Sequence, residues 1–263
     1  MYTFDEKTHT HTLDGKKLTG VTTVIGVVSK GDGLIQWSAN EAVNFLDNYL
    51  KLYKWDELTE KDQQVILNEA KTAWKNSRDT AGDKGKDTHA IVEMIIKYAI
   101  KNGKGMINGE WMSIVNILVD SDEKKAQITQ FLDWAKDKKF LESERNIYSR
   151  ELWVGGIVDF VYELNGEVYI GDVKTAKAIY PTNFWQTSAY QYCLQEMGLY
   201  PKVKGFTIVR LGKDGSFDVK ENFSYDDNIE GFKSALTIYR KLNAITPIKK
   251  VRSTVKINKL TTK

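Results

Sequence analysis

Hydrophobic positions change their spacing along the chain, and each spacing predicts a different element. Polar and apolar residues alternate over residues 8–13, Asp14–Gly15 is a two-residue turn signal, and residues 21–28 form a β-branched apolar run. These features predict that the chain opens with a β-hairpin. Apolar residues then recur with the helical period over residues 34–101, where the last predicted helix covers residues 88–99.

The second half of the chain alternates predicted strands with predicted helices. Residues 154–164 and 167–174 form two predicted strands around Asn165–Gly166, a pair that favours a type I′ hairpin turn. The other elements expected here are a helix over 123–138, a helix over 183–197, strands over 204–210 and 216–220, and a closing helix over 226–242. This order predicts an α/β fold in which a mixed central β-sheet is flanked by helices and follows a helical N-terminal part.

Composition narrows the class of protein. A chain of 263 residues with 41% hydrophobic and 28% charged residues is typical of a globular protein. It has no apolar stretch of about 20 residues, which a membrane span needs, and no secretory signal at its start, so a cytoplasmic protein is expected. The single cysteine, Cys193, excludes an internal disulfide and a four-cysteine metal site, so any metal would need oxygen and nitrogen ligands.

Charge is distributed unevenly along the chain. Residues 247–263 carry six of the 38 lysine and arginine residues and no acidic residue, which leaves residues 1–246 with 32 basic and 35 acidic residues. A basic tail is suited to bind a phosphate backbone, and it is equally consistent with a solubilising terminus.

The predicted hairpin places like charges opposite each other. With a two-residue loop, Leu164 pairs with Glu167 and the numbers of facing residues sum to 331. Asp159 therefore faces Asp172, and Lys174 lies on the same face because side chains alternate along a strand. Facing carboxylates repel each other, and a divalent cation between them would offset the repulsion. The alternative is an ion pair of Lys174 with one aspartate at a solvated edge.

Four short motifs occur in order along the chain. They are Gly85-x-x-x-His89-x-x-x-Glu93, Gly156-Ile-Val-Asp159, Asp172-Val-Lys174-Thr175 and Gln186-Thr-Ser-Ala-Tyr190. With this order and spacing, the chain resembles the PD-(D/E)XK nuclease superfamily, in its RecB-like exonuclease branch, which is common in phages. Residues 11–25 also resemble the N-terminal hairpin of phage and mitochondrial members, so the resemblance covers about residues 9–210.

The resemblance implies a restriction-endonuclease-like core and a role for each matching residue. The implied catalytic residues are Asp159, Asp172 and Lys174. The implied metal ligands are His89, Asp159, Asp172 and the backbone carbonyl of Val173, and the implied supporting or DNA-binding residues are Glu93, Gln186 and Tyr190. Two carboxylates and a carbonyl suit Mg²⁺, and a histidine ligand favours Mn²⁺, so either ion is the expected cofactor.

The match has two departures. The second acidic position is Asp172 where glutamate is more common in the family, which shortens the side chain but keeps the carboxylate. The four cysteines of iron–sulfur members are missing, which excludes those subfamilies.

Several residues have a structural interpretation beside the functional one. Without the resemblance, His89 would be a partly buried histidine paired with Glu93, which has Lys97 as another partner. Gln186 and Tyr190 would be ordinary residues of an amphipathic helix.

Further candidates come from the residue types alone. His9 and His11 share one face of the predicted first strand, but no third ligand is evident, and a solvated hairpin is expected. Glu144 and Glu151 precede the strand of Asp159, and the sequence does not decide which of them approaches the site.

The expected function is a metal-dependent DNA exonuclease that hydrolyses phosphodiester bonds in phage or bacterial DNA recombination, repair or degradation. One alternative is a structure-specific DNA endonuclease on the same fold. Another is a non-catalytic nucleic-acid-binding accessory module of recombination, although two carboxylates that repel phosphate would not serve a protein that only binds.

The expected organisation is one nuclease domain over residues 1–246, followed by the basic tail over 247–263. Within the domain, residues 1–80 would form the hairpin and helical part, and residues 81–246 the catalytic core. The expected partner is linear DNA, with a recombination or annealing protein or a helicase acting in trans, since the chain lacks a Walker A motif. The expected place of action is the cytoplasm of a bacterium or phage-infected host.

Overall fold

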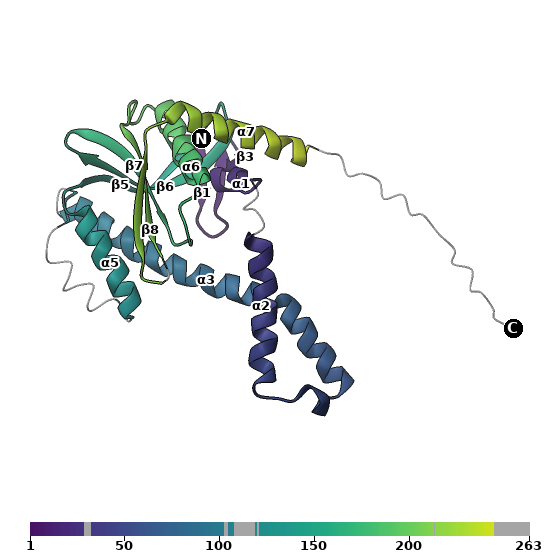
Figure 1. The fold of residues 1–263 in the computed structure, drawn as a ribbon. Coiled ribbons are helices and arrows are strands. Elements are labelled where there is room, and N and C mark those ends of the chain that lie inside the picture. Colours follow the sequence, from purple (N-terminus) through teal and green to yellow (C-terminus); the bar gives the residue numbers. More distant parts are fainter. Residues whose placement is uncertain (29–32, 103–104, 108–118, 120, 213, 245–263) are drawn as a thin grey trace.

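The structure is a computed structural model that describes residues 1–28, 33–102, 105–107, 119, 121–212 and 214–244, without the side chains of residues 33–34 and 81–86. The basic tail over 247–263 lies outside these residues. The fold is α/β, with a mixed sheet flanked by helices, which confirms the predicted fold class (Figure 1).

From residue 122 onward the elements follow the predicted order, apart from one further strand, β5. The strands are β1 (Tyr2–Asp5), β2 (Thr10–Leu13), β3 (Lys16–Lys17), β4 (Thr19–Gly20), β5 (Lys139–Ser149), β6 (Val154–Leu164), β7 (Glu167–Lys174), β8 (Gly205–Leu211) and β9 (Phe217–Asn222). The helices are α1 (Val21–Ile25), α2 (Gly33–Leu50), the 3₁₀ turn η1 (Trp55–Glu57), α3 (Glu60–Asn102), α5 (Asp122–Ala135), α6 (Pro181–Glu196) and α7 (Tyr225–Asn243).

The β6–β7 hairpin has the predicted register. Leu164 pairs with Glu167, and the ladder continues to Phe160 opposite Gly171. Asn165 and Gly166 have φ angles of 53° and 78°, and a type I′ turn requires positive φ at both of these positions. The turn therefore fixes which residues of the two strands face each other.

The sheet is split beside β6. β5 pairs along one edge of β6 over almost its whole length. On the other edge, β4 pairs with Val154 and Gly155, whereas β7 pairs only from Phe160 to Leu164. Because a strand has only two edges, residues 156–159 have no ladder partner on this second edge among the residues that the structure describes. The split lies where β6 carries Asp159.

Two hydrophobic cores hold the sheet from its two faces. One core lies under α1, α6 and α7 and includes Val21, Val158 and Ile170. The other lies under α5 and the C-terminal part of α3, and Phe131 and Phe160 are fully buried in it. Figure 1 shows these helices on opposite sides of the strands.

The N-terminal region differs from the prediction. β2 begins at Thr10, and residues 21–25 form helix α1 where a strand was indicated. Val21 and Val24 are buried three positions apart against the core under α6 and α7, a spacing that suits one face of a short helix. Packing therefore overrides the β propensity of this run.

β1 and β5 were not predicted. β5 contains the polar sequence Glu142 to Asn146 and a register shift between Phe140 and Glu142, so it lacks regular alternation of apolar and polar residues. β5 is extended because it pairs with β6 along almost its whole length.

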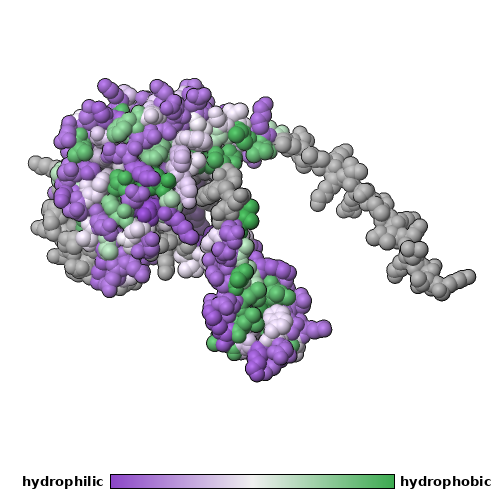
Figure 2. Space-filling model, in the orientation of Figure 1, coloured by the Kyte–Doolittle hydropathy of each residue, from purple (hydrophilic) through white to green (hydrophobic). Residues whose placement is uncertain are grey.

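A helical arm formed by α2 and the first turns of α3 projects from the body (Figure 1). α3 is continuous over 43 residues, so the expected boundary at residues 80/81 falls inside one helix. Hydrophobic side chains gather on the surface of the arm in the view of Figure 2. None of the described helices is both long and apolar enough to cross a membrane.

Candidate active site

Asp159 and Asp172 come together where β6 and β7 separate. They continue the register by one position beyond the last pair, Phe160 and Gly171. Oδ2 of Asp159 accepts a hydrogen bond of 2.7 Å from the backbone N–H of Val173. The side chain of Asp159 thus takes the place of a ladder bond, and the split in the sheet stays open at the two carboxylates.

Asp172 is fully buried, and each of its two carboxylate oxygens contacts a neighbouring polar side chain. Its Oδ1 accepts a hydrogen bond of 3.0 Å from Nε2 of Gln186. Its Oδ2 forms an ion pair with Nζ of Lys174 but accepts no well-oriented hydrogen bond from the described residues. Burial raises the pKa of Asp172 to about 6, with Lys174 lowering it and the charge of Asp159 raising it further.

One lysine faces two carboxylates in this site. Burial lowers the pKa of Lys174, but attraction to Asp172 and Asp159 outweighs burial, so its pKa lies above the ordinary value. Burial also raises the pKa of Asp159, against the opposing effects of Lys174 and the Val173 N–H. A charged lysine neutralises only one of the two carboxylates, which leaves the site short of positive charge.

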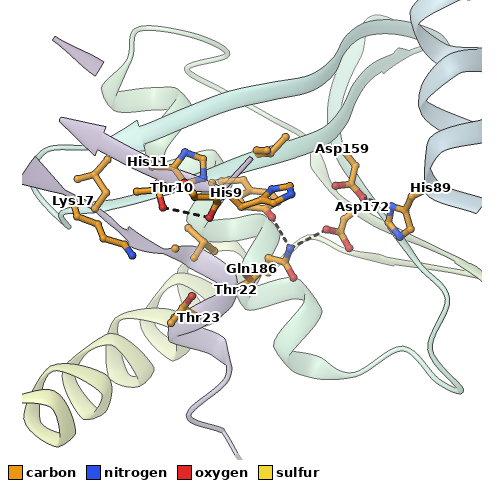
Figure 3. A pocket seen from close by; sticks show the side chains of 18 of the residues that line it. His9, Thr10, His11, Lys17, Thr22, Thr23, His89, Asp159, Asp172 and Gln186 are labelled. Atoms are coloured by element: carbon orange, nitrogen blue, oxygen red, sulfur yellow. Dashed lines mark hydrogen bonds and ion pairs between the residues drawn. The ribbon is translucent and has the colours of Figure 1, made fainter. Parts of the chain in front are cut away.

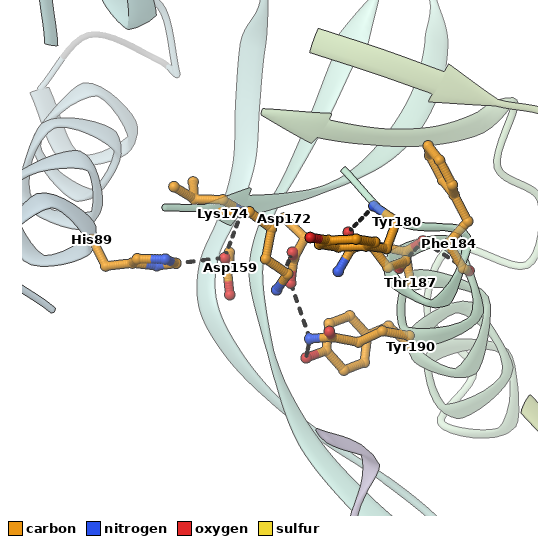
Figure 4. Close-up of polar contacts among 11 residues, drawn as sticks. His89, Asp159, Asp172, Lys174, Tyr180, Phe184, Thr187 and Tyr190 are labelled. Atoms are coloured by element: carbon orange, nitrogen blue, oxygen red, sulfur yellow. Dashed lines mark hydrogen bonds and ion pairs between the residues drawn. The ribbon is translucent and has the colours of Figure 1, made fainter. Parts of the chain in front are cut away.

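Gln186 and Tyr190 lie one turn apart on α6 and face the carboxylates, as Figures 3 and 4 show for the residues they label. Nε2 of Gln186 donates both to Asp172 and to the hydroxyl of Tyr190, the latter at 2.5 Å. A Cβ at Gly156 would lie 3.0 Å from the ring of Tyr190, so glycine lets α6 approach β6 closely here. Both residues are nearly fully buried.

His89 reaches the site from α3. Its Nδ1 lies 3.7 Å from Oδ2 of Asp159, and its side chain is 37% exposed (Figure 4). Burial lowers the pKa of His89, although attraction to Asp172 opposes this. A lowered pKa favours the neutral imidazole, which is the form that ligates a metal.

Glu93 and Glu151 do not line the pocket that holds the carboxylates. Glu93 forms an ion pair with Lys97 on the same helix, the alternative partner that its spacing indicated. Glu151 is exposed and forms a hydrogen bond with Tyr192.

Glu144 does not line the pocket either, but of Glu144 and Glu151 it is the one that the β5–β6 pairing places beside Asp159. In the β5–β6 register Arg145 pairs with Val158, so Glu144 lies opposite Asp159. Its backbone has a φ of 50°, in the left-handed region that few residues other than glycine adopt. Burial, with repulsion from Asp159 and Glu93, raises the pKa of Glu144 to about 8. The choice between Glu144 and Glu151 requires the register of β5 on β6, which the sequence alone does not provide.

His9 and His11 line the same pocket but do not form a pair on one strand. His9 precedes β2 with a φ of 48°, and His11 is buried with its Nδ1 2.6 Å from the hydroxyl of Tyr2. The expectation of a solvated hairpin is therefore wrong for His11, because the hairpin packs on the start of β6, where Gly155 leaves room for the imidazole ring.

The donor set fits a hard divalent cation. No three His, Cys, Asp or Glu side chains in the described part of the chain form a complete metal site. Magnesium needs only one or two carboxylates, since water and other oxygen atoms complete its coordination. The N–H and C=O of one strand residue point to the same neighbouring strand, so the Val173 carbonyl faces the same gap as its N–H. The carboxylates of Asp159 and Asp172 and the carbonyl of Val173 therefore face a gap where negative charge is not fully neutralised.

Six of the predicted site residues line a single pocket with a volume of about 550 Å³, and Glu93 and Val173 do not. His89, Asp159, Asp172, Lys174, Gln186 and Tyr190 all line it. They come from α3, the β6–β7 hairpin and α6, and Figure 3 shows the side chains of His89, Asp159, Asp172 and Gln186 close together.

No family model and no curated protein matches the chain. A solved structure titled "Crystal structure of SSO0001" is similar over 56% of this chain and 71% of that chain, with 12% identity and a TM-score of 0.28. A similarity of this size carries no argument about fold or function.

Proposed function

We propose that the chain is a metal-dependent deoxyribonuclease of the PD-(D/E)XK type that shortens DNA from its ends. The observation that carries the proposal is the pair of opposed carboxylates, the buried Asp172 and the partly buried Asp159, beside Lys174 in an open split of the sheet. A buried site with excess negative charge is costly for the fold and is retained where it serves chemistry.

Asp159, Asp172 and the Val173 carbonyl would hold Mg²⁺ or Mn²⁺, with His89 as a further ligand. When bound, such an ion would supply Lewis-acid chemistry, which lowers the pKa of water and polarises a phosphate. Lys174 places a positive charge beside Asp172, where it stabilises negative charge that develops on the phosphoryl oxygens. Gln186 fixes the orientation of the Asp172 carboxylate by donating a hydrogen bond to it. The same amide group of Gln186 donates a second hydrogen bond to the hydroxyl of Tyr190.

The four sequence motifs support the exonuclease branch over other reactions of a two-carboxylate site. Each motif contributes at least one residue to the same pocket, and His89 and Tyr190 among these lie about 100 positions apart in the chain. The proposed substrate is linear DNA, in phage or bacterial recombination, repair or degradation. A recombination protein or helicase in trans is proposed as the partner.

The test is a time course on end-labelled linear single-stranded and duplex DNA, with a closed circle as control, in EDTA, magnesium or manganese. We expect metal-dependent shortening of linear DNA while the circle stays intact. Asp172→Asn, which keeps the shape of the side chain, should lower the rate by more than about 100-fold, because loss of a direct ligand exceeds the 10–100-fold cost of an outer partner.

Other outcomes of this experiment would support one of the two alternative functions or exclude the proposed site. Cleavage of the circle would identify an endonuclease. DNA binding without cleavage in either metal would identify an accessory module, and full activity of Asp172→Asn would exclude the proposed site.

A further inference from the structure

The pocket extends well beyond the two carboxylates. Its other end is formed by the β2–β3 hairpin and by the residues that follow β4 (Figure 3). Among the residues that line that end are His9, His11, Lys17, Thr22 and Thr23. The proposed hydrolysis uses none of them.

The two ends of the pocket differ in charge. Of the described residues that line it, Asp159 and Asp172 are the acidic ones, and both lie at the end near α6. The hairpin end offers the ammonium group of Lys17 and the hydroxyls of Thr22 and Thr23, all on exposed residues. A surface of cationic and hydroxyl donors without carboxylates favours an anionic ligand.

Lys17 is available to such a ligand. No ion pair joins Lys17 to a carboxylate within the residues that the structure places. Asp14, the acid of the adjacent turn, is already neutralised by Arg150 and by the N-terminal amine. The positive charge of Lys17 is therefore not offset by its own hairpin.

The backbone sets the separation between the two ends. β4 pairs with β6 at Val154 and Gly155, and Asp159 follows four residues later. At about 3.3 Å per strand residue, the point where β4 pairs with Gly155 lies roughly 13 Å from Asp159 along β6. A nucleic-acid strand carries phosphates at every nucleotide, so a strand with its scissile linkage at Asp159 and Asp172 would present a second phosphate near Lys17.

We propose that Lys17, with the hydroxyls of Thr22 and Thr23, forms a binding subsite for a backbone phosphate of the strand that is cut. This inference rests on the proposed function, since it takes the same strand to occupy both ends of the pocket. The subsite holds the nucleic-acid strand across the split in the sheet, and it thereby fixes the direction of the nucleic-acid strand relative to Lys174.

The test compares two neighbouring lysines of β3. Lys17 lines the pocket and Lys16 does not, although both are exposed and carry the same charge. Lys17→Ala, Lys16→Ala and Lys17→Arg are made in the full chain carrying Asp172→Asn, so that binding is measured without cleavage. The readout is fluorescence anisotropy of a labelled single-stranded oligonucleotide in EDTA at several salt concentrations.

We expect Lys17→Ala to weaken binding by about 3–10-fold and to reduce the salt slope by about one, because one phosphate contact is lost. Lys16→Ala should leave the slope unchanged, and Lys17→Arg should keep it. Thr23→Ala should weaken binding less than Lys17→Ala does. In the otherwise wild-type chain, Lys17→Ala should raise KM and leave kcat nearly unchanged.

Two failures are distinguishable. If the wild-type chain binds and cleaves DNA while Lys17→Ala and Lys16→Ala bind alike, the subsite is overturned and the proposed function stands. If the wild-type chain neither binds nor cleaves DNA, the proposed function is overturned, and the subsite with it.

Discussion

At the scale of single residues, the orientation of Asp172 depends on α6. Gln186 gives its carboxylate the hydrogen bond that the split in the sheet does not supply. We expect Gln186→Leu to raise the metal concentration needed for half-maximal nuclease activity by about 10–100-fold, with much of kcat recovered at saturating metal. The measurement is activity against manganese concentration.

The matched control is Gln191→Leu on the same helix. Gln191 is equally buried, but its amide donates to the backbone oxygen of Tyr200, away from the site. Equal metal dependence in both glutamine variants would show that Gln186 acts through general helix packing alone.

Glu144 makes stability depend on pH. Burial raises its pKa to about 8 in the folded chain, so the folded state binds more protons than the unfolded state between about pH 4.5 and 8. The stability contribution of the protonated group is therefore lost as pH rises through this window. Glu144→Gln removes the effect, and the variant should exceed the wild-type chain in melting temperature above about pH 8.

The expected gain in EDTA at about pH 9 is roughly 2–4 °C, which corresponds to about 1 kcal/mol after solvent screening at this half-buried position. At about pH 4 the gain should vanish, because both states are then protonated. Glu151→Gln, at an exposed position, is the control. A gain that is the same at both pH values would contradict the assignment to Glu144.

At the scale of elements, the β6–β7 hairpin depends on glycine as well as on its turn. A Cβ at Gly171 would lie 1.8 Å from Cε2 of Phe160, which is fully buried. Gly171→Ala should therefore lower the free energy of unfolding by about 3 kcal/mol, the upper range for overpacking a core. Urea denaturation followed by circular dichroism measures it.

Gly166→Ala provides a graded comparison in the same hairpin. Its Cβ would meet nothing within 4 Å, and the cost is limited to the positive φ of 78°, about 1–2 kcal/mol. If Gly171→Ala proved no more costly than Gly166→Ala, the close approach of the two strands at Phe160 would be wrong.

The same hairpin shows why part of the site was predictable from sequence. Asn165–Gly166 allows only a tight turn, so counting from the loop places Asp159 opposite Asp172. The position of Glu144 was not predictable, because β5 has an irregular register and a left-handed residue at Glu144 itself. The helical conformation of residues 21–25 was equally hidden, since it depends on the core under α6 and α7.

At the scale of the whole molecule, α3 joins two environments of unequal stability. Its C-terminal part, with Val92, Ile95 and Ile96, is buried in the core under the sheet. Its N-terminal part packs on α2 through a few side chains such as Ile66 and Ala70, which belong to neither core. Apolar side chains such as Ile35 and Val65 on the arm remain exposed and contribute little to holding it.

Amide hydrogen exchange should therefore change sharply within this one helix. Amides near Ile66 and Ala70 should exchange through local opening of the arm, whereas those near Ile95 should exchange only with unfolding of the sheet core. The expected ratio of protection factors is at least about 100, since a difference of 1.4 kcal/mol in opening free energy gives a factor of 10 and the two regions should differ by more than twice that. Uniform protection from Ile66 to Ile96 would mean that the arm and the sheet unfold as one cooperative unit.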